Sequence, residues 1–350
     1  MPLRVPTGLV KHLYPRWPRA DAARPGYSLL LALPPDLPLF LQLALRVCRD
    51  QDATHLNETL IVPDHHRPEF ARSVHEEAEE WPGANIHLVE PDLRARLVRR
   101  RIRQGSLIHW LQVHQGTAAA CSSHVLLHDA DFFSTERTMH RDLYRMASER
   151  DLACAGTSRP RRGVGYPEHP DLDHVVGGWQ LIYSRQWARS RPPHFLMPCT
   201  HRVGGLAIKV DTTVHAQATT PPHRVGRYEP APGSVFHLYG VITTYRRYQR
   251  SSPTFEDDRF HVLFIRLLAD GLRLRDPPDL PALDQLVRGI DDGDQRVHYT
   301  HAARTAYPAF RAEIEPLLTR GFIPPPAARH IADVLERFDH AFATTDAGTR

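Results

Sequence analysis

Lysine, cysteine and long apolar runs are scarce in this chain of 350 residues. Lys11 and Lys209 are the two lysines among 44 basic residues, so arginine carries nearly all of the positive charge, a usage typical of a GC-rich genome. The four cysteines are far apart, with no C-x-x-C pair and no zinc-finger spacing of cysteine and histidine. This excludes a small disulfide scaffold, and we interpret the cysteines as reduced core residues.

The sequence also lacks a segment typical of a membrane helix or a signal peptide. Its most apolar stretch, residues 29–45, is interrupted by three prolines and by Asp36, and prolines do not continue a helix. Residues 1–21 contain no unbroken apolar run. We therefore expect a soluble, cytoplasmic protein without a membrane anchor, and the arginine usage favours a bacterial source.

The excess of positive charge is small. The 44 basic and 40 acidic residues leave a net charge of +4, and the strongly basic run at residues 94–104 has no interleaved aromatic residues of the kind found in a nucleic-acid-binding module. We therefore expect no nucleic-acid partner. Hydrophobic residues make up 41% of the chain and charged residues 24%, a globular composition that excludes intrinsic disorder.

Strand-like and helix-like patterns alternate along the first part of the chain. Apolar runs of strand length lie at residues 27–33, 59–64, 85–91 and 124–133. Helical patterns lie between them, at residues 37–48, 68–81 and 93–121, with an interruption around Gly105. This alternation predicts an α/β fold with a mostly parallel, Rossmann-like sheet and helices on both faces. Further strand patterns lie at residues 152–158 and 177–184, and from residue 255 onward the pattern is mostly helical.

The pattern Asp-x-Asp occurs four times, at positions 50/52, 129/131, 171/173 and 292/294. Of these pairs, Asp129 and Asp131 alone follow directly on an apolar strand pattern. Side chains two residues apart on an extended chain project to the same side, with α-carbons roughly 6.5 Å apart. Two carboxylates at the carboxyl end of a strand suit Mg²⁺ or Mn²⁺. The alternative is that the two aspartates cap a following turn or helix.

The order of elements up to the stretch HDAD resembles the GT-A fold of nucleotide-sugar-dependent glycosyltransferases, whose motif is Asp-x-Asp. The resemblance covers residues 27–245. It implies that Asp131 is the main ligand of a divalent cation, and that Asp129 contacts the cation or the donor ribose. It also implies a UDP- or GDP-linked sugar as the donor.

Three downstream segments resemble the same family in the same order. Gly177, Gly178 and Trp179 match a glycine-bearing loop beside the donor and acceptor pocket, although a plain turn and a core tryptophan are alternatives. Asp211 matches the catalytic base, but Val210 replaces the glutamate that usually precedes it, and helix capping is an alternative role for the aspartate. His237 matches the C-terminal histidine ligand of the metal, although an ordinary histidine is an alternative.

The basic run at residues 94–104 lies on an expected helix. Arg99 and Arg100 in this run are candidates to bind the donor diphosphate, because a guanidinium neutralises charge on a leaving phosphate. The alternative is a solvated helix face.

We expect three regions: an N-terminal lead-in at 1–26, a GT-A-like catalytic domain at 27–250, and a helical region at 251–350. In the catalytic domain, residues 27–133 would bind the nucleotide-sugar and residues 150–250 the acceptor. The expected activity is transfer of a sugar to a hydroxyl or amine, with inversion, on a small molecule or soluble glycan. The helical region would shape the acceptor site or form a contact in a homo-oligomer.

Four alternatives remain open. One is a retaining transferase of the same fold. A nucleotidylyltransferase needs a glycine-rich phosphate loop after the first strand, where this chain has PPDLP. A metal phosphohydrolase is suggested by the adjacent His128 and Asp129, but such sites lie on helices and the neighbouring residues favour a strand. The last is a non-catalytic binding protein.

Overall fold

The computed structural model describes residues 7–101, 104–158, 169–238, 240–251, 254–255, 260–274, 280–291, 298–320 and 323–343. The Asp-x-Asp pair at 292/294 lies outside these ranges. Contacts divide the chain into two compact units. The first comprises Met1–Ala130 and Arg137–Pro230, and the second comprises Asp131–Glu136 and Ala231–Arg350.

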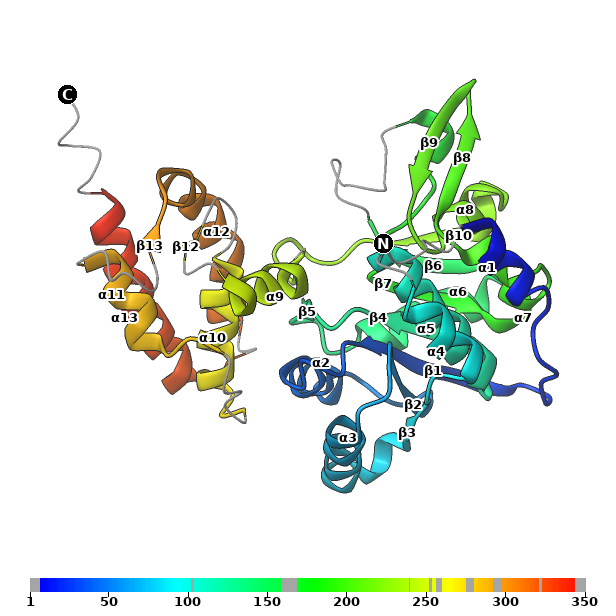
Figure 1. Ribbon diagram of the computed structural model, residues 1–350, viewed down its shortest axis with the longest axis horizontal. Coiled ribbons are helices and arrows are strands. Elements are labelled where there is room, and N and C mark those ends of the chain that lie inside the picture. Colours follow the sequence, from blue (N-terminus) through cyan, green and yellow to red (C-terminus); the bar gives the residue numbers. More distant parts are fainter. Residues whose placement is uncertain are drawn as a thin grey trace. The chain divides into compact units, whose positions relative to one another are not determined.

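A seven-stranded sheet forms the centre of the first unit, with the strand order β10-β6-β7-β4-β1-β2-β3 (Figure 1). Its strands are β1 (Arg24–Leu33), β2 (Leu56–Pro63), β3 (Ile86–Leu88), β4 (Ser122–His128), β6 (Cys154–Thr157), β7 (Gln180–Ser184) and β10 (Val225–Tyr228). Strand β7 runs antiparallel to β4 and β6, and the other neighbouring strands are parallel. The predicted mostly parallel α/β sheet is therefore confirmed.

Helices cover both faces of this sheet. On one face, Trp110 of α5 (Gly105–Ala119) is buried in the same cluster as Leu30 and Leu127 of the sheet. Helix α5 approaches closely because Gly116 has no side chain: a Cβ atom there would lie 2.3 Å from Leu30. On the other face, Tyr27 of β1 contacts two aromatic rings of α6 (Met139–Glu149). Helix α2 (Leu39–Arg49) also contacts β1.

Further elements complete the described part of the first unit. They are the helices α1 (Thr7–Leu13), α3 (Pro68–Glu80), α4 (Leu93–Arg99), α7 (Arg185–Arg189) and α8 (Val214–Ala218), the hairpin of β8 (Cys199–Val203) and β9 (Leu206–Val210), and the 3₁₀ turns Pro82–Ala84, Pro170–Leu172, Pro193–Leu196 and Pro222–Arg224. The helical pattern expected over 93–121 is thus two helices, α4 and α5.

The second unit joins a two-stranded sheet to a group of helices. Strand β5 (Phe132–Ser134) pairs antiparallel with β11 (Val235–His237), and Phe133 and Phe236 both pack on Phe264. The other elements are α9 (Val241–Ser251), α10 (His261–Gly271), α11 (Leu283–Asp291), α12 (His301–Thr319), α13 (Pro325–Ala343) and the paired β12 (Thr254–Phe255) and β13 (His298–Tyr299). The helical C-terminal region is confirmed. Among the described residues, no helix combines the length and the apolarity needed to cross a membrane.

Candidate functional site

Asp129 directly follows β4, which lies in the interior of the seven-stranded sheet. Its backbone N–H donates to the carbonyl of Trp179 at 2.8 Å, which extends the pairing of β4 with β7 by one residue. Its carboxylate is 28% exposed and lies 3.6 Å from Nε2 of His109 on α5. The aspartate therefore faces the α5 side of the sheet and remains accessible to a ligand.

Asp131 and His237 meet in the second unit, 106 residues apart in sequence. The carboxylate of Asp131 is 10% exposed, and its Oδ1 lies 3.2 Å from Nε2 of His237. The pairing of β5 with β11 sets His237 opposite Phe132, and the N–H of Leu238 donates to the carbonyl of Asp131 at 2.9 Å. Backbone pairing on both sides of the contact thus holds the carboxylate and the imidazole together.

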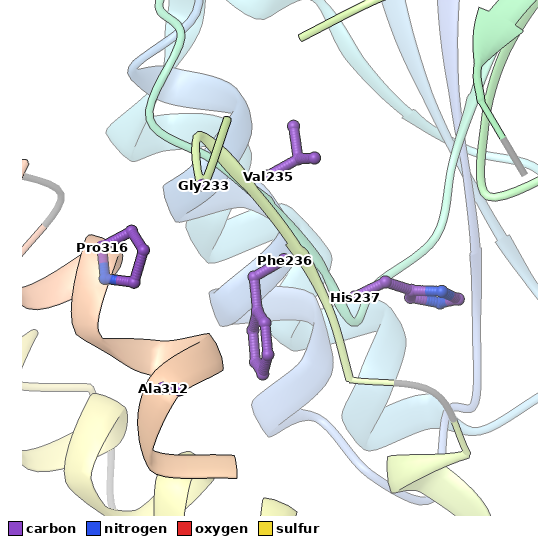
Figure 2. A pocket seen from close by; sticks show the side chains of 6 residues that line it. All are labelled: Gly233, Val235, Phe236, His237, Ala312 and Pro316. Atoms are coloured by element: carbon purple, nitrogen blue, oxygen red, sulfur yellow. The ribbon is translucent and has the colours of Figure 1, made fainter. Parts of the chain in front are cut away.

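Successive side chains along β11 project to opposite sides of the strand. Phe236 points toward the helix that carries Ala312, whereas His237 points the opposite way (Figure 2). A cavity of about 340 Å³ lies at this strand and is lined by Gly233, Val235, Phe236, His237, Ala312 and Pro316. Phe236 therefore lies on the helix side of the strand, and His237 contacts Asp131 on the opposite side.

The Gly177–Trp179 segment supports Asp129 through its backbone. The indole N–H of Trp179 donates to Oγ1 of Thr157 at 3.0 Å, and the N–H of Gly177 donates to the carbonyl of the same threonine at 2.9 Å. A Cβ atom on Gly177 would lie 2.4 Å from the Trp179 ring, so glycine is required there. Trp179 is 7% exposed. Its stacking on a sugar, and the donor contacts of Gly177 and Gly178, stay predictions.

Asp211 lies between β9 and α8 in the first unit. Its Oδ1 accepts a hydrogen bond from the N–H of Thr212 at 2.7 Å. The turn continues through Thr213, which has a positive φ of 70° and whose N–H donates to Leu196. Asp211 is thus half-buried at a fixed position, and its role as a base stays a prediction.

A second charged cluster lies at the carboxyl end of β2. The Asp64 carboxylate, 6% exposed, accepts hydrogen bonds from Arg99 at 3.0 Å and lies 2.6 Å from Nδ1 of His65. Burial raises the pKa of Asp64, but the hydrogen bond with His65 and the charge of Arg99 more than offset it, so the pKa lies below its usual value. Arg100 is exposed.

Asp64 is not among the residues predicted from the sequence, although the signal is present in the run LIVPD, where an aspartate directly follows an apolar strand. Arg99 was singled out for the donor diphosphate, and the structure shows it paired with a carboxylate of its own chain. Its contact with a donor stays a prediction, as does that of Arg100.

Comparison with known proteins gives matches in solved structures alone. No family model matches the chain, and no curated protein matches it. A mannosyltransferase from Pyrobaculum calidifontis, in complex with GDP-Man and Mn²⁺, is 16% identical with a TM-score of 0.40, over 95% of this chain and 91% of that chain. Glucosyl-3-phosphoglycerate synthase from Mycobacterium tuberculosis, with Mn²⁺, UDP and glucosyl-3-phosphoglycerate, is 12% identical with a TM-score of 0.41, over 63% and 78%.

TarS from S. aureus, residues 1–349, is 11% identical with a TM-score of 0.37, over 93% of this chain and 92% of that chain. These structures are glycosyltransferases, the class of protein that the sequence resembles. All three TM-scores lie below 0.5, and we base the following proposal on the residues of this chain.

Proposed function

We propose that this chain is a metal-dependent glycosyltransferase that moves a sugar from a UDP- or GDP-linked donor to a hydroxyl or amine of an acceptor. The observation that carries the proposal is the segment Asp129-Ala130-Asp131 at the carboxyl end of β4, with His237 within hydrogen-bond distance of Asp131. Ligands of parallel sheets bind at the carboxyl ends of strands, which is where this segment lies.

The donor atoms fit a divalent cation of the Mn²⁺ or Mg²⁺ type. Two carboxylates and an imidazole offer oxygen and nitrogen, without sulfur. Asp129 and Asp131 are joined through one alanine, so their α-carbons are at most about 7 Å apart and both carboxylates can reach one ion. Asp131 and His237 are held together by the pairing of β5 with β11. When bound, the cation supplies Lewis-acid stabilisation of the diphosphate leaving group.

The other residues act on the donor and the acceptor. Asp211 takes the proton from the attacking hydroxyl or amine, which directs the nucleophile to the face opposite the diphosphate and gives inversion. Arg99 or Arg100 neutralises phosphate charge. The buried Trp179 holds Asp129 in register through its carbonyl group, as its 2.8 Å hydrogen bond shows.

Calorimetric titration with UDP- and GDP-linked sugars, with and without Mn²⁺, tests the proposal. We expect one nucleotide class to bind in Mn²⁺ and its affinity to collapse in chelator, because the diphosphate completes the coordination of the cation. Donor binding that ignores the metal would contradict the metal site. No binding of any nucleotide-sugar would contradict the transferase.

Product stereochemistry tests the inverting assignment separately. NMR of the product formed from an axial donor should show an equatorial glycoside. An axial product would establish retention and remove Asp211 from the role of base.

A further inference from the structure

A second group of metal-ligating side chains lies inside the first unit, and its chemistry differs from that of the aspartates. Cys48 comes from α2, His128 is the last residue of β4, and His140 comes from α6. One ligand atom from each lies within 4.8 Å of the other two. The exposed fractions are 2%, 1% and 3%, so the group is sealed from solvent.

The strand register explains why these residues meet. His128 is paired with Leu31 of β1 and Gln180 of β7, and Leu31 is on the face of the sheet that also presents Tyr27 to α6. His128 therefore points toward α2 and α6, whereas Asp129, the next residue, points toward α5. The two successive residues at the end of β4 thus present their side chains on opposite faces of the sheet.

The His128 ring is oriented by a second buried side chain. Its Nδ1 lies 2.6 Å from Oε1 of Gln180, which is fully buried. A carbonyl oxygen can only accept, so Nδ1 carries the proton and Nε2 presents a lone pair. Metal-bound histidines commonly donate their second N–H to such an oxygen, which fixes the tautomer and the ring orientation. The two histidine rings lie 5.7 Å apart at 73°, so they are not stacked face to face.

We propose that Cys48, His128 and His140 form a zinc site with three protein ligands. A thiolate with two imidazoles is a soft, nitrogen- and sulfur-rich set that suits Zn²⁺, whereas Mg²⁺ and Mn²⁺ prefer oxygen. Ligand atoms around tetrahedral zinc lie roughly 3.4–3.8 Å apart, so side-chain shifts of about 1 Å bring the three atoms onto the ion. As the sulfur–zinc bond forms, the Cys48 thiol gives its proton to a water molecule that enters with the hydrated ion, and one water of that ion remains as the fourth ligand.

The site would join three elements at one point. Zinc would tie α2 and α6 to the end of β4, one residue before Asp129, and so fix the strand end independently of any donor or catalytic metal. This proposal does not depend on the transferase activity.

Zinc content of the full chain tests the proposal. Protein incubated with a slight excess of Zn²⁺ and gel-filtered should retain about one zinc per chain by mass spectrometry. Cys48→Ala and His140→Ala should each retain less than about a tenth of that amount. Cys154→Ala is the matched control, because Cys154 is an equally buried thiol in β6. Asp131→Ala is the second control, and it should keep its zinc.

Cobalt substitution of the wild-type protein gives a readout that does not depend on how the variants fold. Co²⁺ bound here should show a thiolate-to-cobalt charge-transfer band, which an oxygen and imidazole site cannot give. X-ray absorption at the zinc edge should show one sulfur and two imidazole ligands. Wild-type protein that retains no zinc, or zinc with oxygen and nitrogen ligands alone, would overturn the proposal.

Discussion

The carboxyl ends of β2 and β4 each carry an aspartate directly after an apolar strand, but the two carboxylates have different surroundings. Asp64, after β2, is 6% exposed and is held by Arg99 and His65. Asp129, after β4, is 28% exposed, and its neighbour His109 is 3.6 Å away. A permanent guanidinium lies beside the buried Asp64, whereas the Asp129 carboxylate is more exposed to solvent and has an imidazole as its neighbour. The same position in two strands thus serves an internal ion pair in one case and, in our proposal, a metal in the other.

The largest effect should follow from removing Asp131, the main ligand of the proposed metal site. Asp131→Ala should reduce sugar transfer to background and abolish the dependence of donor binding on Mn²⁺, because Lewis-acid stabilisation is worth several kcal/mol. Asp171→Ala is the control, since this aspartate belongs to another Asp-x-Asp pair and is 65% exposed. Near-normal turnover of Asp131→Ala, measured by product formation, would contradict the metal assignment.

A third aspartate extends the comparison, because Asp211 directly follows β9. Asp211→Asn should lower turnover by about 10² to 10⁴, the usual contribution of a general base, while donor affinity is unchanged. The amide keeps the size of the carboxylate and can still accept from the N–H of Thr212. Steady-state kinetics and donor titration together decide the matter: equal losses in donor affinity and turnover would point to a binding role instead.

At β2, the expected effect is on stability. Arg99→Ala should lower the free energy of unfolding by about 1–3 kcal/mol, because it leaves the buried Asp64 carboxylate without its guanidinium partner. Arg100→Ala should change it by less than about 0.5 kcal/mol, as an exposed residue of the same helical segment. Urea denaturation measures both.

Donor titration of the same two variants separates the proposed diphosphate contact from the ion pair. A loss of affinity in Arg100→Ala with unchanged stability would assign the phosphate contact to Arg100.

The smallest effect should be a pH dependence of the same cluster. The folded-state pKa of Asp64 lies below its usual value. Its contribution to stability is therefore fully present above the pKa of the unfolded chain, about 3.9, and is lost as the pH falls through the folded-state pKa. The stability difference between wild type and Asp64→Asn, from urea denaturation at pH 7 and pH 3, should shrink in acid. A difference that grows in acid would contradict the direction of the shift.

Sequence patterns predicted the features of the fold that are set by residues close together in the sequence, such as strands and the residues at their ends. The run of apolar residues before Asp129 predicted both the strand and the position of the aspartate at its end. The direction of β7 was not predictable in this way, because an apolar run has the same pattern in parallel and antiparallel strands. The pairing of residues between strands shows that β7 runs antiparallel to both β4 and β6.

These patterns could not predict contacts between residues that are far apart in the sequence. Cys48 and His140 are 92 positions apart (140 minus 48), and no spacing rule connects them. Arg99 was assigned a ligand from its charge, but charge cannot reveal that Asp64 lies within 2.9 Å. His237 was placed beside Asp131 through family resemblance, and it is the pairing of β5 with β11 that brings the two side chains together.

The pairing of β5 with β11 also sets an order of events during synthesis. Strand β5 begins at Phe132 and β11 at Val235, so a ribosome adds 103 residues (235 minus 132) between them. At about 5–20 residues per second, this interval lasts about 5–20 s. Strands β6, β7 and β10 are made within this interval, so the seven-stranded sheet has all of its strands before His237 is added beside Asp131. His237 is therefore the last of the three proposed metal ligands to be made, and a chain that stopped before it would carry all seven strands of the sheet with two of those ligands, Asp129 and Asp131.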